Sequence, residues 1–166
     1  SQSNYGEDLI FGARYGGLYY WTANSGVTTR SQPLQNVFPS SDVPTVQQWM
    51  LVSDRSRFTM CFGVNDIGSA TLDPMLIRWS DQESVVDWAP AATNQAGSIR
   101  LSNGSEIVTA LQTRQEIVVW TDSALYSLQY VGPPDVWAAQ MKSVLTELHR
   151  VVKKNGVIAF EVGEIR

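Results

Sequence analysis

Few residues in this chain have the types and spacing that catalysis or metal binding requires. The sequence contains one histidine, His149, and one cysteine, Cys61. Any Ser-His-Asp assembly or histidine-based metal centre would depend on that single histidine, which flanks the apolar stripe of a predicted helix and is interpreted as structural. Cys61 lies in an apolar run, so we interpret it as a small buried hydrophobe rather than a reactive thiol. We expect no catalytic residue.

A second set of candidates is acidic. Asp81, Glu83 and Asp87 could offer oxygen ligands to a divalent cation, but the segment lacks the glycine turn and closing glutamate of a dedicated calcium loop. We therefore favour a solvated turn here. No metal-binding or cofactor-binding residue is predicted, and no cofactor is expected.

The tryptophans form the most distinctive pattern. The chain has six of them, and three lie at the ends of predicted strands, each followed by a hydroxyl residue. A hydroxyl or carboxylate in that position can accept N–H groups of the following turn. We interpret the tryptophans as packing and assembly residues, and a carbohydrate-stacking or base-stacking face is the alternative. The predicted packing and assembly residues are Trp21, Trp79, Trp120, Trp137, Met141, Leu145 and Leu148.

The elements that must position these side chains are mostly strands. Short apolar runs alternate with polar turns, which predicts a mainly β, antiparallel short-strand meander that is propeller-blade-like or a sandwich. Residues 15–17, 53–56 and 121–124 are predicted hairpin turns, and Asn103-Gly104 is predicted to be a two-residue hairpin turn between strands at 98–102 and 107–111. Residues 31–44 are expected to be an irregular loop. The predicted strands are 9–14, 18–22, 46–52, 57–64, 75–79, 98–102, 107–111, 116–120 and 125–131.

The pattern changes after Pro134. Apolar residues then recur about every 3.6 positions, which predicts an amphipathic helix over 135–154, followed by a final strand over 157–162. We divide the chain into a β-rich region, 1–134, and a helix-strand segment, 135–166, packed on the same domain. The predicted helix docks on the β-structure through its apolar stripe.

Composition limits the classes of function. The chain has 166 residues, a net charge of −4 and 17% charged residues. It is long enough to bury a core in one domain. It has no cluster of Lys and Arg before residue 150, which argues against a nucleic-acid groove or an anionic membrane surface. The N-terminal residues do not resemble a signal peptide and no apolar run would cross a bilayer, so we expect a soluble protein that is not exported.

The region from Tyr5 to Pro134 resembles the β-rich structural subunits of tailed-phage tails, the nozzle or tail-tube family. The resemblance is carried mainly by residues 73–134, including the strand ends at Trp79-Ser80-Asp81 and Trp120-Thr121-Asp122. It implies a non-enzymatic virion building block, made in the host cytoplasm and located in the phage tail. Its implied partners are other tail subunits or copies of itself, with no membrane and no strong nucleic-acid signal.

Residues 141–166 resemble a different family, the late helix and strand of S-adenosylmethionine-dependent DNA methyltransferases. The glycine-rich cofactor loop of that family is absent, and its catalytic Pro-Pro motif has only an incomplete counterpart at Pro133-Pro134. No catalytic residue is carried over, and no binding of the cofactor is expected. The joining of two resemblances is explained by a natural fusion, a chimera or chance likeness. The alternative functions are a truncated or degenerate nucleic-acid methyltransferase and a carbohydrate- or nucleic-acid-binding β module.

Overall fold

The structure is a computed structural model that describes residues 1–37 and 42–130. The predicted helix over 135–154 and the predicted strand over 157–162 lie outside the described residues, and so do Trp137, Met141, Leu145 and Leu148. In the part that is described, the protein is mainly β, as predicted. No helix among these residues is long and apolar enough to cross a membrane.

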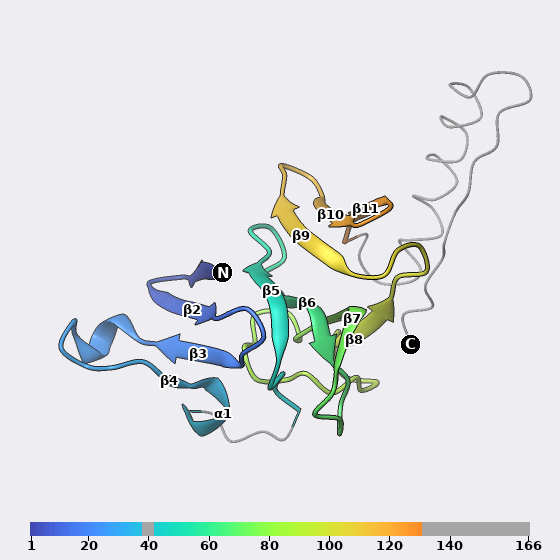
Figure 1. The fold of residues 1–166 in the computed structure, drawn as a ribbon. Helices are drawn as coiled ribbons and strands as arrows, with labels where there is room; N and C mark the ends of the chain where they lie inside the picture. Colours follow the sequence, from blue (N-terminus) through green and yellow to red (C-terminus); the bar gives the residue numbers. More distant parts are fainter. Residues whose placement is uncertain (38–41, 131–166) are drawn as a thin grey trace, which may run out of the picture. The chain divides into compact units, whose positions relative to one another are not determined.

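The strands form three antiparallel sheets, and each sheet is a meander in which neighbours in sequence are hydrogen-bonded neighbours in space (Figure 1). Sheet A contains β1 (Gln2–Tyr5), β2 (Asp8–Gly12), β3 (Leu18–Trp21) and β4 (Gln32–Pro33). Sheet B contains β5 (Gln47–Val52), β6 (Thr59–Asn65), β7 (Leu72–Trp79) and β8 (Gly97–Arg100). Sheet C contains β9 (Ile107–Gln112), β10 (Ile117–Thr121) and β11 (Leu125–Leu128). A 3-10 helix, Ala23–Ser25, and a short helix α1, Leu34–Val37, belong to the connections.

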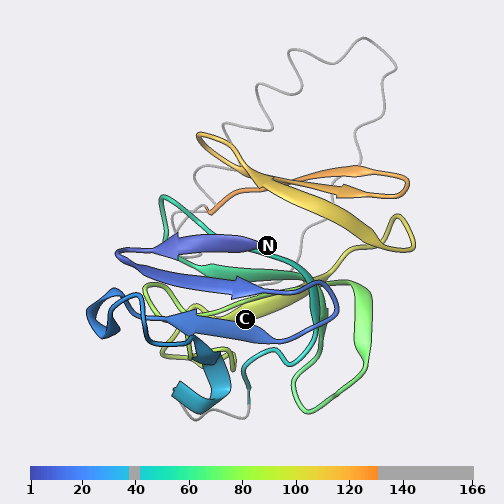
Figure 2. The ribbon, with the colours of Figure 1, turned by 60° about the vertical axis from the view of Figure 1, so that its left-hand side comes forward.

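Sheet B is the middle layer, because apolar side chains cover both of its faces. Met50, Cys61 and Leu76 on one face share a core with Ile10 and Tyr20 of sheet A. On the other face, residues of β5, β6 and β7 share a second core with sheet C, whose contributing residues are Ile107, Ala110, Ile117 and Val119. Figure 2 shows sheet C, in yellow and orange, as a separate layer. The meander and the sheet-on-sheet packing of the prediction are thus both present.

A bulge in β7 interrupts its pairing with β6: the step from Phe62 to Val64 on β6 corresponds to the step from Ile77 to Asp73 on β7. Gly63 at that point has a φ of 56°. Residues two apart on a regular strand share a face, but here Phe62 belongs to the core with sheet C and Val64 to the core with sheet A. The glycine is required because a Cβ would lie 2.4 Å from Oε1 of the buried Gln48.

Three of the predicted hairpins are confirmed. The strand pairs β2–β3, β5–β6 and β10–β11 are antiparallel and are joined by the turns expected at 15–17, 53–56 and 121–124. In the first turn Tyr15 has a positive φ, 64°, whereas Gly16 and Gly17 do not. The local turn signals identified the hairpins but not the backbone conformation of each residue.

The predicted hairpin at Asn103-Gly104 is wrong. β8 pairs with β7, and β9 pairs with β10, so residues 101–106 connect sheet B to sheet C. Gly104 does have a positive φ, 123°, but Asn103 does not, as a type I′ turn would require. The interpretation failed because an Asn-Gly signal marks a change of direction, whereas the burial of apolar faces decides which strands pair.

The first strand and the crossing segment were also missed. β1 lies in a polar N-terminal stretch, where the sequence shows no apolar alternation, yet it pairs with β2 along its whole length. Residues 31–44, expected to be irregular, contain β4 and α1. Leu34 of α1 is fully buried in the core shared by sheets A and B, so tertiary packing supplies the order that the local pattern does not predict.

Candidate functional site

The three described tryptophans predicted to be assembly residues lie in three different sheets. Trp21 ends β3 in sheet A, Trp79 ends β7 in sheet B, and Trp120 lies in β10 of sheet C. Trp79 packs against the core between sheets B and C, and the Trp88 side chain is fully buried in the core between sheets A and B. The described tryptophans therefore do not form one common stacking face.

The indole N–H groups of the half-buried tryptophans are used in local hydrogen bonds. The Trp79 Nε1 donates to the carbonyl of Gln95 at 2.7 Å, and the Trp21 Nε1 donates to the carbonyl of Thr29 at 3.0 Å. Gly97 allows the Trp79 ring to lie flat on β8, because a Cβ there would be 2.5 Å from the ring. Trp79 thus packs within the fold and Trp21 is held by one hydrogen bond to the following connection, while their role in assembly stays a prediction.

The expected turn-capping hydroxyl is found after one of these three tryptophans. Thr121 Oγ1 accepts the N–H groups of Ser123 and Ala124, at 3.3 Å and 2.9 Å. After Trp21, the corresponding N–H of Ala23 is bound by the carboxylate of Asp8. After Trp79, the Ser80 hydroxyl accepts the N–H of Thr59 on the neighbouring strand. The same sequence pattern thus serves three different local structures.

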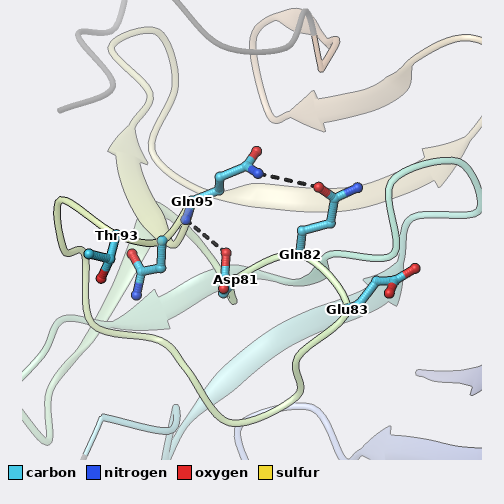
Figure 3. Close-up of a pocket in the computed structure, with 6 residues that line it drawn as sticks. Asp81, Gln82, Glu83, Thr93 and Gln95 are labelled. Carbon is cyan, nitrogen blue, oxygen red and sulfur yellow. Dashed lines mark hydrogen bonds between the residues drawn. The ribbon is translucent and has the colours of Figure 1, made fainter.

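A polar hollow lies within the connection from β7 to β8, between its first and its last residues (Figure 3). It has a volume of about 400 Å³ and is lined by Asp81, Gln82, Glu83, Thr93, Asn94 and Gln95. Two hydrogen bonds join the two ends of this connection across the hollow. Gln95 N donates to Asp81 Oδ1 at 2.8 Å, and Gln95 Nε2 donates to Gln82 Oε1 at 3.3 Å. The hollow is open and its polar groups bond to one another.

The acidic residues around this hollow serve as turn acceptors. Asp87 Oδ2 accepts the Ser84 hydroxyl at 2.9 Å, and the Asp87 carbonyl accepts the N–H of Asp81 at 2.7 Å. Within residues 1–37 and 42–130, no group of three His, Cys, Asp or Glu side chains is placed to hold a metal ion. Asp81, Glu83 and Asp87 therefore lie in the structured turn that the sequence favoured, with hydrogen bonds of their own.

A buried arginine, which the sequence analysis did not single out, organises the opposite end of sheet B. Arg78 is 1% exposed, and its guanidinium donates to the carbonyls of Asn65 at 2.9 Å and Asp42 at 2.6 Å. It also lies 5.9 Å from the centre of the Trp88 ring. Burial lowers the pKa of Arg78. The sequence did contain a signal for this site, namely a charged residue in a strand of apolar residues. In the structure the Arg78 guanidinium binds backbone carbonyls at the end of β6 and in the segment before β5.

The remaining candidate is a surface, the outer face of sheet C, which we define as Val108, Leu111, Val118, Trp120 and Leu125. Leu111 and Val118 are cross-strand partners, and Trp120 is directly opposite Leu125. Leu125 is 62% exposed and Leu111 is 58% exposed. Val108 is the extra residue at a bulge opposite Trp120 and Thr121, and it is also exposed. These side chains alternate with the ones that face sheet B.

The composition of this face is unusual for a surface exposed to water. The other outward positions on these strands are Thr109 and Ser127, and the charge at the margin of this face is the carboxylate of Glu116, directly before β10, which accepts the hydroxyl of Ser127. Fully burying a Val or Leu side chain is worth about 1.5–3 kcal/mol, and most of that is unrealised for Leu111 and Leu125. β11 is an edge strand with neither Lys nor Pro, the residues that commonly protect such an edge. A contiguous apolar face of this kind is typical of a protein–protein contact.

Sheet A presents a related face on its side away from sheet B. We define the outer face of sheet A as Leu9, Phe11, Tyr19 and Trp21, which are two pairs of cross-strand partners on β2 and β3. The rings of Phe11 and Tyr19 are stacked with centres 5.6 Å apart. The sequence showed both faces as apolar strands but gave no sign of which side each would present.

Comparison with known proteins found no relative of this chain. No protein-family model, no curated protein and no solved structure matches the chain.

Proposed function

We propose that this protein is a non-enzymatic structural protein that works by assembly, as its resemblance to tailed-phage tail subunits implies. The observation that carries the proposal is the outer face of sheet C, an exposed apolar surface on a sheet whose other face is already packed. On this proposal the protein is a virion tail component, and its partners are other tail subunits or copies of itself.

The mechanism follows from the way in which the sheets stack within the chain. Each contact between sheets is made by apolar side chains that alternate with residues on the opposite face. A protein partner with a similar face would bury Leu111, Trp120 and Leu125 without having to desolvate a charge. The rigid meander holds these side chains in place before association, so little conformational entropy is lost on binding.

The test is sedimentation velocity of the intact protein across a range of concentrations. The parent protein should form an associated species that dissociates on dilution. Leu111→Lys with Leu125→Lys should remove that species, because both side chains are exposed and two buried charges oppose the contact. Circular dichroism should show an unchanged fold.

Val27→Lys is the matched control. Val27 is a 92% exposed apolar residue in the connection between β3 and β4, and it is not among the residues that define either outer face. It should leave association unchanged. If the Leu111→Lys, Leu125→Lys protein associates as strongly as the parent, the outer face of sheet C does not carry the function.

A further inference from the structure

We propose that the outer face of sheet C binds the outer face of sheet A of a second copy of this chain, so that copies add head to tail. This inference rests on the proposed function and names its partner. It goes further by assigning two different faces to one contact, which makes the association heterologous rather than twofold symmetric.

The stacking within the chain gives the first argument. Sheet B receives sheet A on one face and sheet C on the other, so the three sheets form a row in sequence order. Among the described residues, the faces left at the two ends of that row are the outer faces of sheets A and C. A second copy whose sheet A packs on sheet C of the first copy continues the row with the same kind of contact.

The composition of the two outer faces gives the second argument. In the contact between sheets B and C, sheet B contributes aromatic side chains such as Phe62 and aliphatic ones such as Ile77, and the inner face of sheet C is mainly aliphatic. The outer faces resemble these two surfaces, because that of sheet A combines three aromatic rings with Leu9 and that of sheet C is mainly aliphatic. Two copies joined through sheet C alone would bring two mainly aliphatic faces together and would not repeat the contact found within the chain.

Charge is consistent with this pairing. The outward positions of sheet A outside the named face are Gln2, Asn4 and Pro33, which are uncharged. The Asp8 carboxylate is on the inward side, where it accepts the hydroxyl of Tyr20. The outer face of sheet C has one carboxylate at its margin, that of Glu116, which accepts the hydroxyl of Ser127. Packing this face on an identical copy would bring two such carboxylates together, whereas the named positions of sheet A add no negative charge to the contact.

The size of the faces sets the expected strength. Three strands about 4.8 Å apart, with about five residues of 3.3 Å each, give a face about 15 Å on a side. That is roughly 230 Å² on each partner, well below the roughly 800 Å² per partner of a standard interface. We therefore expect weak, transient association, and measurements should extend to about 1 mM.

The experiment uses one variant on each face. Leu111→Lys blocks the outer face of sheet C, and Tyr19→Lys blocks the outer face of sheet A. Each variant alone should be monomeric at concentrations where the parent associates. A mixture of the two should form a dimer and no larger species, because the intact sheet A of the first variant meets the intact sheet C of the second. Sedimentation equilibrium measures the mass in each case.

Asn4→Lys is a second variant for sheet A, because Tyr19 stacks on Phe11 and its replacement also affects the sheet itself. Asn4 is exposed and outward on β1, opposite Leu9, so a lysine there adds a charge to the face without removing a packed ring. It should behave as Tyr19→Lys does, both alone and in the mixture. Val27→Lys should associate like the parent.

Three outcomes overturn the inference. If the two sheet A variants dimerise alone while Leu111→Lys does not, two copies meet through sheet C only; the head-to-tail contact is then wrong and the proposed function survives. If the parent is monomeric throughout and Leu111→Lys lowers its melting temperature, a segment of the same chain covers the face. If the parent associates and no variant has an effect, the proposed function fails as well.

Discussion

The carboxylate of Asp122 accepts two hydrogen bonds from Ser105, one from its backbone N–H at 2.8 Å and one from its hydroxyl at 2.6 Å. Ser105 belongs to the connection from sheet B to sheet C, and Asp122 belongs to the turn between β10 and β11. The pair therefore fastens the entry of sheet C to its far hairpin. Hydrogen bonds from the Ser105 hydroxyl and N–H lower the pKa of Asp122.

Asp122→Ala should lower the melting temperature of the protein, since both donors of Ser105 lose their acceptor in the fold. Asp122→Asn retains one side-chain oxygen and should have a smaller effect. Thermal unfolding followed by circular dichroism measures both. Equal melting temperatures for Asp122→Ala and the parent would mean that this contact does not hold the connection.

Gly104→Val should destabilise the protein by about 2 kcal/mol or more, for two reasons. Its φ of 123° is unfavourable for a β-branched residue, and a Cβ would lie 2.7 Å from Asp122 Oδ1 and 2.8 Å from Thr121 Oγ1. Gly68→Val is the control, because Gly68 has a φ of 75° and open space around it. It should cost about 1 kcal/mol through backbone strain alone. Urea denaturation should rank the two variants in this order.

Cys61 should react with a thiol reagent only when the protein unfolds. Its side chain is fully buried in the core between sheets A and B, and burial raises the pKa of the thiol, so thiolate is scarce at neutral pH. Absorbance after addition of an aromatic disulfide reagent should show no release in buffer and one equivalent in denaturant. Rapid stoichiometric release from the folded protein would contradict this packing.

Acid should weaken the contacts that the Asp8 side chain makes within sheet A and with the residue after β3. The carboxylate accepts the hydroxyl of Tyr20 and the N–H of Ala23, and these bonds lower the pKa of Asp8. A carboxylate with a pKa lowered by folding stabilises the folded state at neutral pH, and this stabilisation is lost as the pH falls through that value. Asp8→Asn should therefore have a lower melting temperature than the parent at pH 7.

The difference between Asp8→Asn and the parent should become smaller as the pH is lowered below 4, because the carboxyl then takes up a proton in the unfolded state first and in the folded state at a lower pH. Asp54→Asn, in the β5–β6 turn, serves as a control for loss of one negative charge. A difference that is constant from pH 7 to pH 3 would show that the charge of Asp8 is irrelevant to stability.

Local sequence determined much of the secondary structure. Alternating apolar residues placed β2, β3, β5, β6, β10 and β11 close to their observed positions, and short polar turns identified the hairpins that join them. The reason is physical: two strands joined by a tight turn pair with each other at little cost in loop entropy. The acidic segment 81–87 is a turn, as interpreted, with local hydrogen bonds such as that from Ser84 to Asp87, but the bond of Asp81 to Gln95 comes from the far end of the β7–β8 connection.

Tertiary structure decided everything that depends on which faces meet. The Asn103-Gly104 signal could not reveal that β8 returns to β7 while β9 pairs with β10, because apolar burial across two sheets selects those partners. The same holds for Arg78, whose carbonyl acceptors are brought to it from distant loops. The sequence singled out Trp120 as a packing or assembly residue but not Leu111, and it did not show that both face outward. Their outward position follows from packing, because sheet B has room for one face of sheet C and the opposite face of that sheet is left exposed.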